Sequence, residues 1–237
     1  MGTTSIAELW DRVVGGQPAP PGWLVWVTAA VALAGVVPHG VWRVTRNAVT
    51  IAHEGGHALV ALVCGRRLQG IRLHSDTSGL TVSRGKPYGA GMVCTAAAGY
   101  TAPPLLGLAG AGLLATGHIT ALLWGAVALL LAMLVMIRNA YGALAVVVAG
   151  GAFFLVSWLT GPAVQAGFGY LVVWFLLVGG VRPVFELQGK RRRRASGDSD
   201  PDQLARLTRI PAGGWLLCFH AVALCALLLG GRLLLGV

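Results

Sequence analysis

Long uninterrupted apolar runs restrict the fold of this chain more than any other feature of its sequence. Of its 237 residues, 56% are hydrophobic and 11% are charged, which is about half the charged share of ordinary soluble domains. The bilayer core is about 30 Å thick and a helix rises about 1.5 Å per residue, so about 18 apolar residues are enough to cross it. The sequence therefore predicts an all-α polytopic membrane protein.

Short polar segments separate the apolar runs within one predicted membrane domain, residues 1–237. A lead-in at 1–21 precedes the first run, a polar segment at 66–86 follows the second, and a polar loop at 182–211 precedes the last. We expect about six to seven transmembrane helices. The apolar runs themselves lie at residues 23–37, 42–64, 88–116, 119–137, 141–159, 168–181 and 215–235.

Basic residues in the loops predict the orientation of the chain. The net charge is +10, and the densest basic block is Lys190–Arg194. Because short loops rich in Lys and Arg stay in the cytoplasm, one crossing per run places 182–211, 66–86 and the N-terminus inside and the C-terminus outside. Arg43 and Arg46 are exceptions, since they fall on the outer side. We expect membrane lipids as partners, including anionic headgroups, and no nucleic acid.

The polar segment 66–86 predicts a small β-hairpin inserted between helices. Ile71 and Leu73 alternate with polar residues, a turn cluster follows at 75–79, and the alternation resumes over 80–83. An open strand edge can hold an extended substrate by strand addition, provided that protein covers it or that it lines a wet cavity. Ile71 and Leu73 are therefore candidate substrate-binding residues. The alternative interpretation is a solvated loop.

The motif His53-Glu54-Gly55-Gly56-His57 is the strongest chemical signal in the sequence. Residues four apart share a helix face, so His53 and His57 can bind one zinc ion. Glu54 can then act as general base on a water that zinc makes acidic. A charge at membrane depth costs about 2.5–3.5 kcal/mol, which favours a functional role for Glu54. The alternative is a helix end at the interface, with Glu54 solvated and both histidines incidental.

Catalytic zinc usually has a third protein ligand, and few residues of this chain qualify. Asp198, Asp200 and Asp202 lie in the polar loop, on the same predicted side as the hairpin, and His74 in the hairpin competes with them. Spacing alone does not choose among these four. Ser199 and Asp200 are equally consistent with the start of a short helix.

Several short pieces between Asn47 and Trp215 resemble motifs of one protease superfamily. They are His53-Glu54-Gly55-Gly56-His57-Ala58-Leu59, Ile71-Arg72-Leu73-His74, Ala98-Gly99-Tyr100, Arg138-Asn139-Ala140-Tyr141-Gly142 and Ser199-Asp200-Pro201-Asp202-Gln203-Leu204-Ala205. On these residues the chain resembles the site-2 protease superfamily, and more narrowly its compact bacterial M50B-like branch.

The resemblance implies a zinc-dependent protease of the bacterial plasma membrane, with its zinc toward the cytoplasmic side. It favours Asp200 as third ligand with Asp202 in reserve, although the superfamily's Leu-Asp-Gly motif is absent from this sequence. It also suggests Asn139 as a residue near zinc and the substrate, with helix capping as the alternative. Gly99 is expected only to permit close helix packing.

The function predicted from these features is hydrolysis of a peptide bond in or near a membrane-embedded protein substrate. One alternative is an inactive scaffold that keeps the fold, but the intact Glu54 argues against it. The other is a small transporter with a structural metal, which lacks support because no paired half-helices are evident. The sequence leaves the substrate, the cleavage site and the oligomeric state open.

Overall fold

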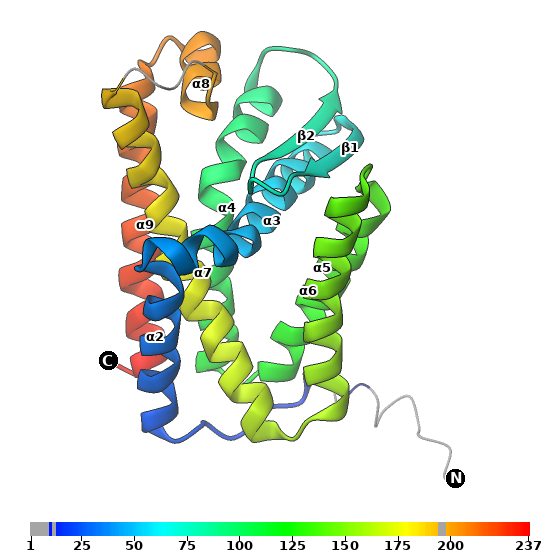
Figure 1. Ribbon diagram of the computed structural model, residues 1–237, viewed down its shortest axis with the longest axis vertical. Helices are drawn as coiled ribbons and strands as arrows, with labels where there is room; N and C mark the ends of the chain where they lie inside the picture. The colour runs from blue at the N-terminus through cyan, green and yellow to red at the C-terminus, as the bar shows by residue number, and fades with distance from the viewer. Residues whose placement is uncertain (1–9, 11–12, 194–197) are drawn as a thin grey trace.

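The computed structural model describes residues 10, 13–193 and 198–237, and it shows a helical bundle with a small sheet at one end (Figure 1). Parts of the lead-in and of the polar loop lie outside these described residues. The elements are α2 (Gly22–Val36), α3 (His39–Val63), β1 (Arg67–Leu73), β2 (Gly79–Arg84), α4 (Ala90–Ala115), α5 (Ile119–Met136), α6 (Ala140–Leu159), α7 (Pro162–Arg192), α8 (Asp200–Thr208) and α9 (Ala212–Leu235).

Five helices of the described chain, α4, α5, α6, α7 and α9, are long and apolar enough to cross a membrane. The pair α2 and α3, bent by 104° at a short break, meets the same criterion when the two helices are taken together, and counted as one span it brings the number to six. Figure 1 shows α2 rising from the end that carries the C-terminus and α3 continuing toward the opposite end. The all-α polytopic fold with an inserted hairpin is confirmed, but the first two apolar runs make one broken crossing instead of two.

Pro38 causes the break between α2 and α3. It has an extended backbone conformation and no N–H, so the α2 helix cannot continue through it. Arg182 of α7 donates hydrogen bonds to the carbonyls of Val36 and Val37, the latter at 2.9 Å. Its guanidinium also lies 5.0 Å from the ring centre of Trp42. The carbonyls that end α2 thus obtain the partners that a continuous helix would have supplied.

The single broken crossing changes the predicted orientation of the N-terminal segment. The Gln17 N–H donates to the Gly117 carbonyl at 2.8 Å, and its side-chain amide donates to Gln165 at 3.0 Å. Residue 17 therefore lies by the α4–α5 turn and the start of α7, at the end opposite the hairpin and α8 (Figure 1). For the described part of the lead-in around residue 17, the prediction that it shares the side of the hairpin and polar loop is wrong.

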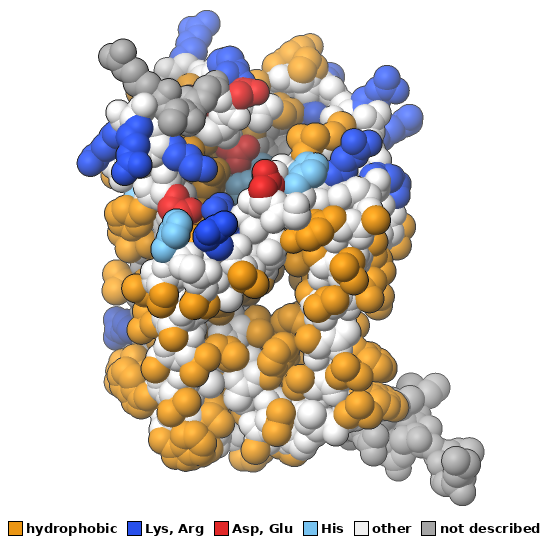
Figure 2. All heavy atoms as spheres, viewed as in Figure 1, with side chains coloured by type: hydrophobic (Ala, Val, Ile, Leu, Met, Phe, Trp, Pro, Cys, Tyr) orange, Lys and Arg blue, Asp and Glu red, His pale blue; other side chains and the backbone are white. Residues whose placement is uncertain are grey.

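The single broken crossing also explains why Arg43 and Arg46 did not fit the predicted charge pattern. α3 begins part-way along the molecule, and Arg46 lies 3.7 Å from Glu186 near the C-terminal end of α7. Figure 2 shows most Lys and Arg side chains gathered at the end that carries α8 and the hairpin, and hydrophobic side chains around the rest. The basic side chains therefore mark one end of the molecule.

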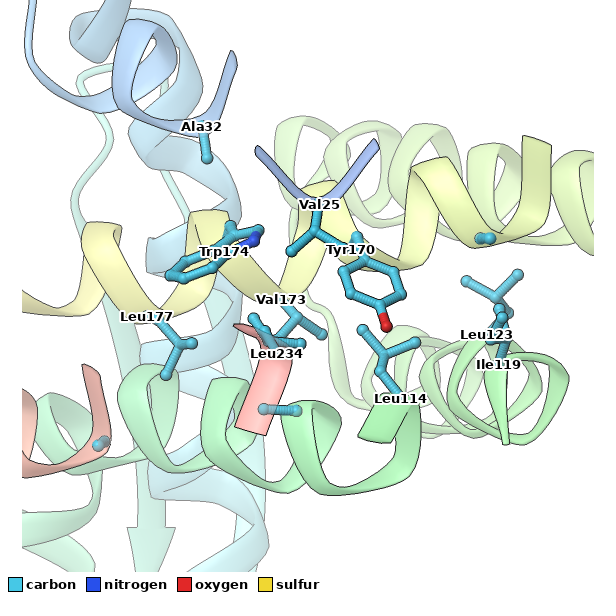
Figure 3. Packing of buried hydrophobic residues seen from close by; sticks show 13 residues of the cluster. Val25, Ala32, Leu114, Ile119, Leu123, Tyr170, Val173, Trp174, Leu177 and Leu234 are labelled. Carbon is cyan, nitrogen blue, oxygen red and sulfur yellow. The ribbon is translucent and has the colours of Figure 1, made fainter. Parts of the chain in front are cut away.

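α7 forms the centre of the main core. Figure 3 shows Val173 and Leu177 of this helix between α7 and α4, with Tyr170 reaching toward Leu114. Leu177 is fully buried, and a Cβ at Gly230 of α9 would lie 2.7 Å from its Cδ1. The absence of a side chain there lets α9 approach α7 closely.

The predicted hairpin is present as an antiparallel pair in which Ile71 lies opposite Thr81. Its β1 edge contacts the turn between α5 and α6, where Arg138 N–H donates to the Ile71 carbonyl at 2.9 Å. The Asn139 side chain extends this contact, because it accepts a hydrogen bond from the Leu73 N–H and donates one to the Leu73 carbonyl. The turn therefore fixes the sheet to the bundle along the β1 edge.

We predict that Arg182→Ala lowers the thermal unfolding temperature of the detergent-solubilised protein. The variant leaves two carbonyls at the helix break without their charged donor, and such hydrogen bonds contribute about 1.5–3 kcal/mol each. Arg232→Ala is the matched control, since among the described residues the Arg232 side chain donates to the Val237 carbonyl alone, near the exposed end of α9. Equal unfolding temperatures for the two variants would contradict the role of Arg182.

Candidate metal centre

The two motif histidines lie on one face of α3, as their spacing predicts. Their Nε2 atoms are 3.1 Å apart and their ring planes are inclined at 82°. Both nitrogens thus converge on one point beside the helix.

Asp200, the first residue of α8, brings a carboxylate to this point. Its Oδ2 lies 3.3 Å from Nε2 of His53 and 3.4 Å from Nε2 of His57. The other three candidates point elsewhere. Asp198 accepts a hydrogen bond from Arg206 at 2.7 Å, and Asp202 accepts from Arg191 and Ser199. His74 faces Ser78 at 3.3 Å in the exposed hairpin turn. Of the four candidates that the sequence left open, Asp200 joins the histidines.

The spacing of the three ligand atoms fits a tetrahedral metal ion. Zinc binds His nitrogen and carboxylate oxygen at about 2.0–2.2 Å, so two tetrahedral ligand atoms lie roughly 3.3 Å apart. The observed separations of 3.1, 3.3 and 3.4 Å are close to this value. His53, His57 and Asp200 are a group within the described residues able to hold such an ion.

A backbone carbonyl determines which nitrogen of His57 is available to a metal. Nδ1 lies 2.7 Å from the carbonyl oxygen of Thr95 in α4. A carbonyl only accepts hydrogen bonds, so Nδ1 must carry a proton, and Nε2 is the nitrogen of this ring that can bind a metal. The Thr95 carbonyl thus orients the ring, a role that sequence analysis could not find because any residue supplies this group.

Gly99 of α4 makes room for both imidazoles. A Cβ at this position would lie 2.3 Å from Nε2 of His57 and 2.6 Å from Nε2 of His53. Sequence analysis expected Gly99 to serve helix packing alone, whereas the atoms that approach it closely belong to the candidate ligands. Close helix contact is instead the role of Gly56, where a Cβ would lie 2.3 Å from Cβ of Ala102.

Glu54 is enclosed between α3 and β2. Its side chain is 5% exposed, and its Oε2 accepts a hydrogen bond from the Thr81 hydroxyl at 2.6 Å. A Cβ at Gly79 would lie 2.5 Å from its Oε1. Glu54 and His53 line the same cavity of about 180 Å³. The carboxylate is therefore buried, hydrogen-bonded and beside the candidate metal ligands.

The comparison with known families agrees with this geometry. A family model described as Peptidase M50B-like matches residues 26–230. The chain belongs to the M50B-like peptidase family. The matched region contains α3, the hairpin and α8, and with them every candidate metal ligand of this membrane peptidase. Among curated proteins and among solved structures, no match was found.

In this M50B-like peptidase the three candidate substrate-binding residues contact one another. Ile71 and Leu73 are buried in a cluster with Met133 and Val146. The Asn139 amide donates to the Leu73 carbonyl at 2.6 Å and accepts from its N–H at 3.2 Å. Although Asn139 precedes α6, its side chain does not cap that helix. Substrate binding by these residues stays a prediction, and their observed contacts hold β1 in place.

The carboxylates of α8 have displaced pKa values. Burial alone would raise the pKa of Asp200, but the imidazoles of His53 and His57 outweigh it and hold this pKa well below its usual range. For Asp202, burial is likewise outweighed by hydrogen bonds from Arg191 and Ser199, so its pKa is also lowered. Both side chains are therefore anionic at neutral pH.

We predict that Gly99→Ala prevents metal binding, because its Cβ would displace both imidazoles. Zinc content of the purified protein should fall to background, as measured by atomic emission. Gly112→Ala in the same helix is the matched control, since a Cβ there meets no atom within 4 Å. Wild-type zinc content in Gly99→Ala would show that the metal lies elsewhere.

Proposed function

We propose that this M50B-like peptidase is a zinc-dependent intramembrane endopeptidase. The observation that carries the proposal is the convergence of His53, His57 and Asp200 within 4.8 Å of one another. Glu54 supports it, because this buried carboxylate lines the same small cavity as His53. A metal site without an adjacent base would suit a scaffold or a transporter equally well.

The proposed reaction gives each of these residues a separate role. His53, His57 and Asp200 would hold zinc, which when bound supplies a Lewis acid and an acidified water. Glu54 accepts a proton from the attacking water and returns it to the leaving amine. The Thr81 hydroxyl holds one Glu54 oxygen, so the other remains available for the proton. The cavity of about 180 Å³ has room for several waters, each of which takes about 30 Å³.

β2 is the strand on which we place an extended substrate. The β1 edge is occupied at Ile71 and Leu73 by the α5–α6 turn. Within the described residues, no backbone hydrogen bond reaches the edge of β2 that faces away from β1. Because Thr81 of this strand contacts Glu54, a peptide added to β2 would run close to the general base. Ile71 and Leu73 would then support the hairpin from its buried side.

An apolar cavity supports a membrane-embedded substrate. It has a volume of about 1010 Å³ and lies between α3, α4 and α7 on one side and the α5–α6 pair on the other. Figure 2 shows the molecule hollowed between these two groups. Small residues such as Ala52, Gly55, Ala98 and Ala102 line it, and small residues allow a helix backbone to approach closely. We assign this space to the apolar helix of a membrane-protein substrate.

We further propose that the end with α8 and the hairpin faces the cytoplasm of a bacterial plasma membrane. Lys and Arg gather at this end, as the positive-inside rule requires, and the other described end has few of them (Figure 2). Membrane lipids are the expected partners of the exposed apolar helix faces, and no nucleic acid is expected. Residue 17 and the C-terminal end of α9 would then lie on the outer side.

The first test is metal content together with turnover. We expect about one zinc per wild-type chain and none in His57→Ala or Asp200→Ala. Glu54→Gln should keep zinc but lose cleavage of a single-span membrane protein by at least about a hundredfold, as general-base catalysis contributes roughly 10²–10⁴-fold. Zinc in the wild type without measurable cleavage, and no difference between wild type and Glu54→Gln, would favour the scaffold.

A second test concerns the substrate strand. Thr81→Pro should abolish cleavage of the same substrate without loss of zinc, because proline disrupts backbone pairing in β2. Thr81→Val separates the two roles of this residue, since it removes the hydroxyl near Glu54 and keeps the backbone N–H. Unchanged turnover in Thr81→Pro would contradict strand addition at β2.

A further inference from the structure

Asp200 is the one member of the candidate metal centre that does not lie on α3. It is carried by α8, a nine-residue helix within the polar loop that is too short to cross a membrane. The histidines keep their separation because α3 is a continuous helix. The position of Asp200, in contrast, depends on how α8 is attached to the rest of the molecule.

Asp202 joins α8 to the end of α7. Its Oδ1 accepts a hydrogen bond from Arg191, which lies in the last turn of α7. Its Oδ2 accepts from the Ser199 N–H at 3.1 Å and from the Ser199 hydroxyl at 2.5 Å. Both carboxylate oxygens of Asp202 therefore accept hydrogen bonds from the protein. One binds the end of α7, and the other binds Ser199, the residue directly before Asp200.

The apolar side of α8 supplies the second attachment. Leu204 is fully buried in a cluster with Val184 and Leu187 of α7 and Phe219 of α9. Pro201, directly after Asp200, is also buried and restricts the backbone at this point. With Ser199 held by Asp202, the backbone on both sides of Asp200 is fixed. The carboxylate is thereby directed at His53 and His57.

We propose that Asp202 and Arg191 are positioning residues of the metal centre, which hold Asp200 in place as the third ligand. This inference rests on the proposed zinc site. Asp202, the reserve candidate for the third ligand, then has a different role, because it orients the ligand and does not bind the ion. Loss of residues that orient metal ligands typically weakens metal affinity about 10–100-fold.

The test is zinc affinity, measured by competition with a chromophoric chelator on the detergent-purified full chain. Asp202→Asn and Arg191→Gln should each weaken zinc binding by about 10–100-fold. Because the two residues act through one contact, the double variant should be no weaker than the worse single one. Arg191→Lys, which keeps the charge, should recover part of the affinity.

Asp198→Asn is the matched control. Asp198 lies two residues before Asp200 and pairs with Arg206, but its side chain is 84% exposed, and we expect wild-type affinity. Complete loss of zinc in Asp202→Asn with no effect of Arg191→Gln would make Asp202 a direct ligand and overturn the proposal. Lower thermal stability with unchanged affinity would also overturn it. If wild-type protein itself binds no zinc, the proposed function fails together with this inference.

Discussion

The need to satisfy every backbone polar group in apolar surroundings is the constraint on which this structure depends. The chain breaks its first crossing at Pro38, and this break would leave the carbonyls at the end of α2 without partners. Arg182 reaches them from α7 and is itself held by Glu186 at 3.0 Å. The break lets α3 leave the direction of α2 by 104°, so that its histidine face meets α4 and α8.

Each polar group of the candidate centre has a partner from another part of the chain. Glu54 is buried beside a hydroxyl, His57 beside a carbonyl, and the third ligand beside two imidazoles. A buried charge without a partner costs several kcal/mol, so each of these contacts matters to the fold as well as to the chemistry. Gly99 permits the whole arrangement, because any larger side chain would occupy the place of the imidazoles.

Much of this could be predicted from local patterns. Apolar length determines which segments can cross a membrane, and alternation around the turn cluster near Ser75 indicated the hairpin. Hydropathy registers two runs on either side of Pro38 and not the bend between them, so of the predicted six to seven crossings the structure favours the lower number. The predicted side of the lead-in was wrong at residue 17 for the same reason, since each crossing reverses the side of everything before it. The poor fit of Arg43 and Arg46 to the charge pattern was the sign of this error.

By itself the sequence determined the membrane class, the hairpin, and the pair His53 and His57 with Glu54, because helix periodicity alone brings residues four apart together. Only the tertiary structure decided that Asp200 joins them while Asp202 holds α8 to the end of α7. It also decided that Gly99 leaves room for the imidazole ligands and that Thr81 contacts the carboxylate of Glu54. These contacts join residues from different helices and strands. They depend on how those elements pack together, which a local sequence pattern does not specify.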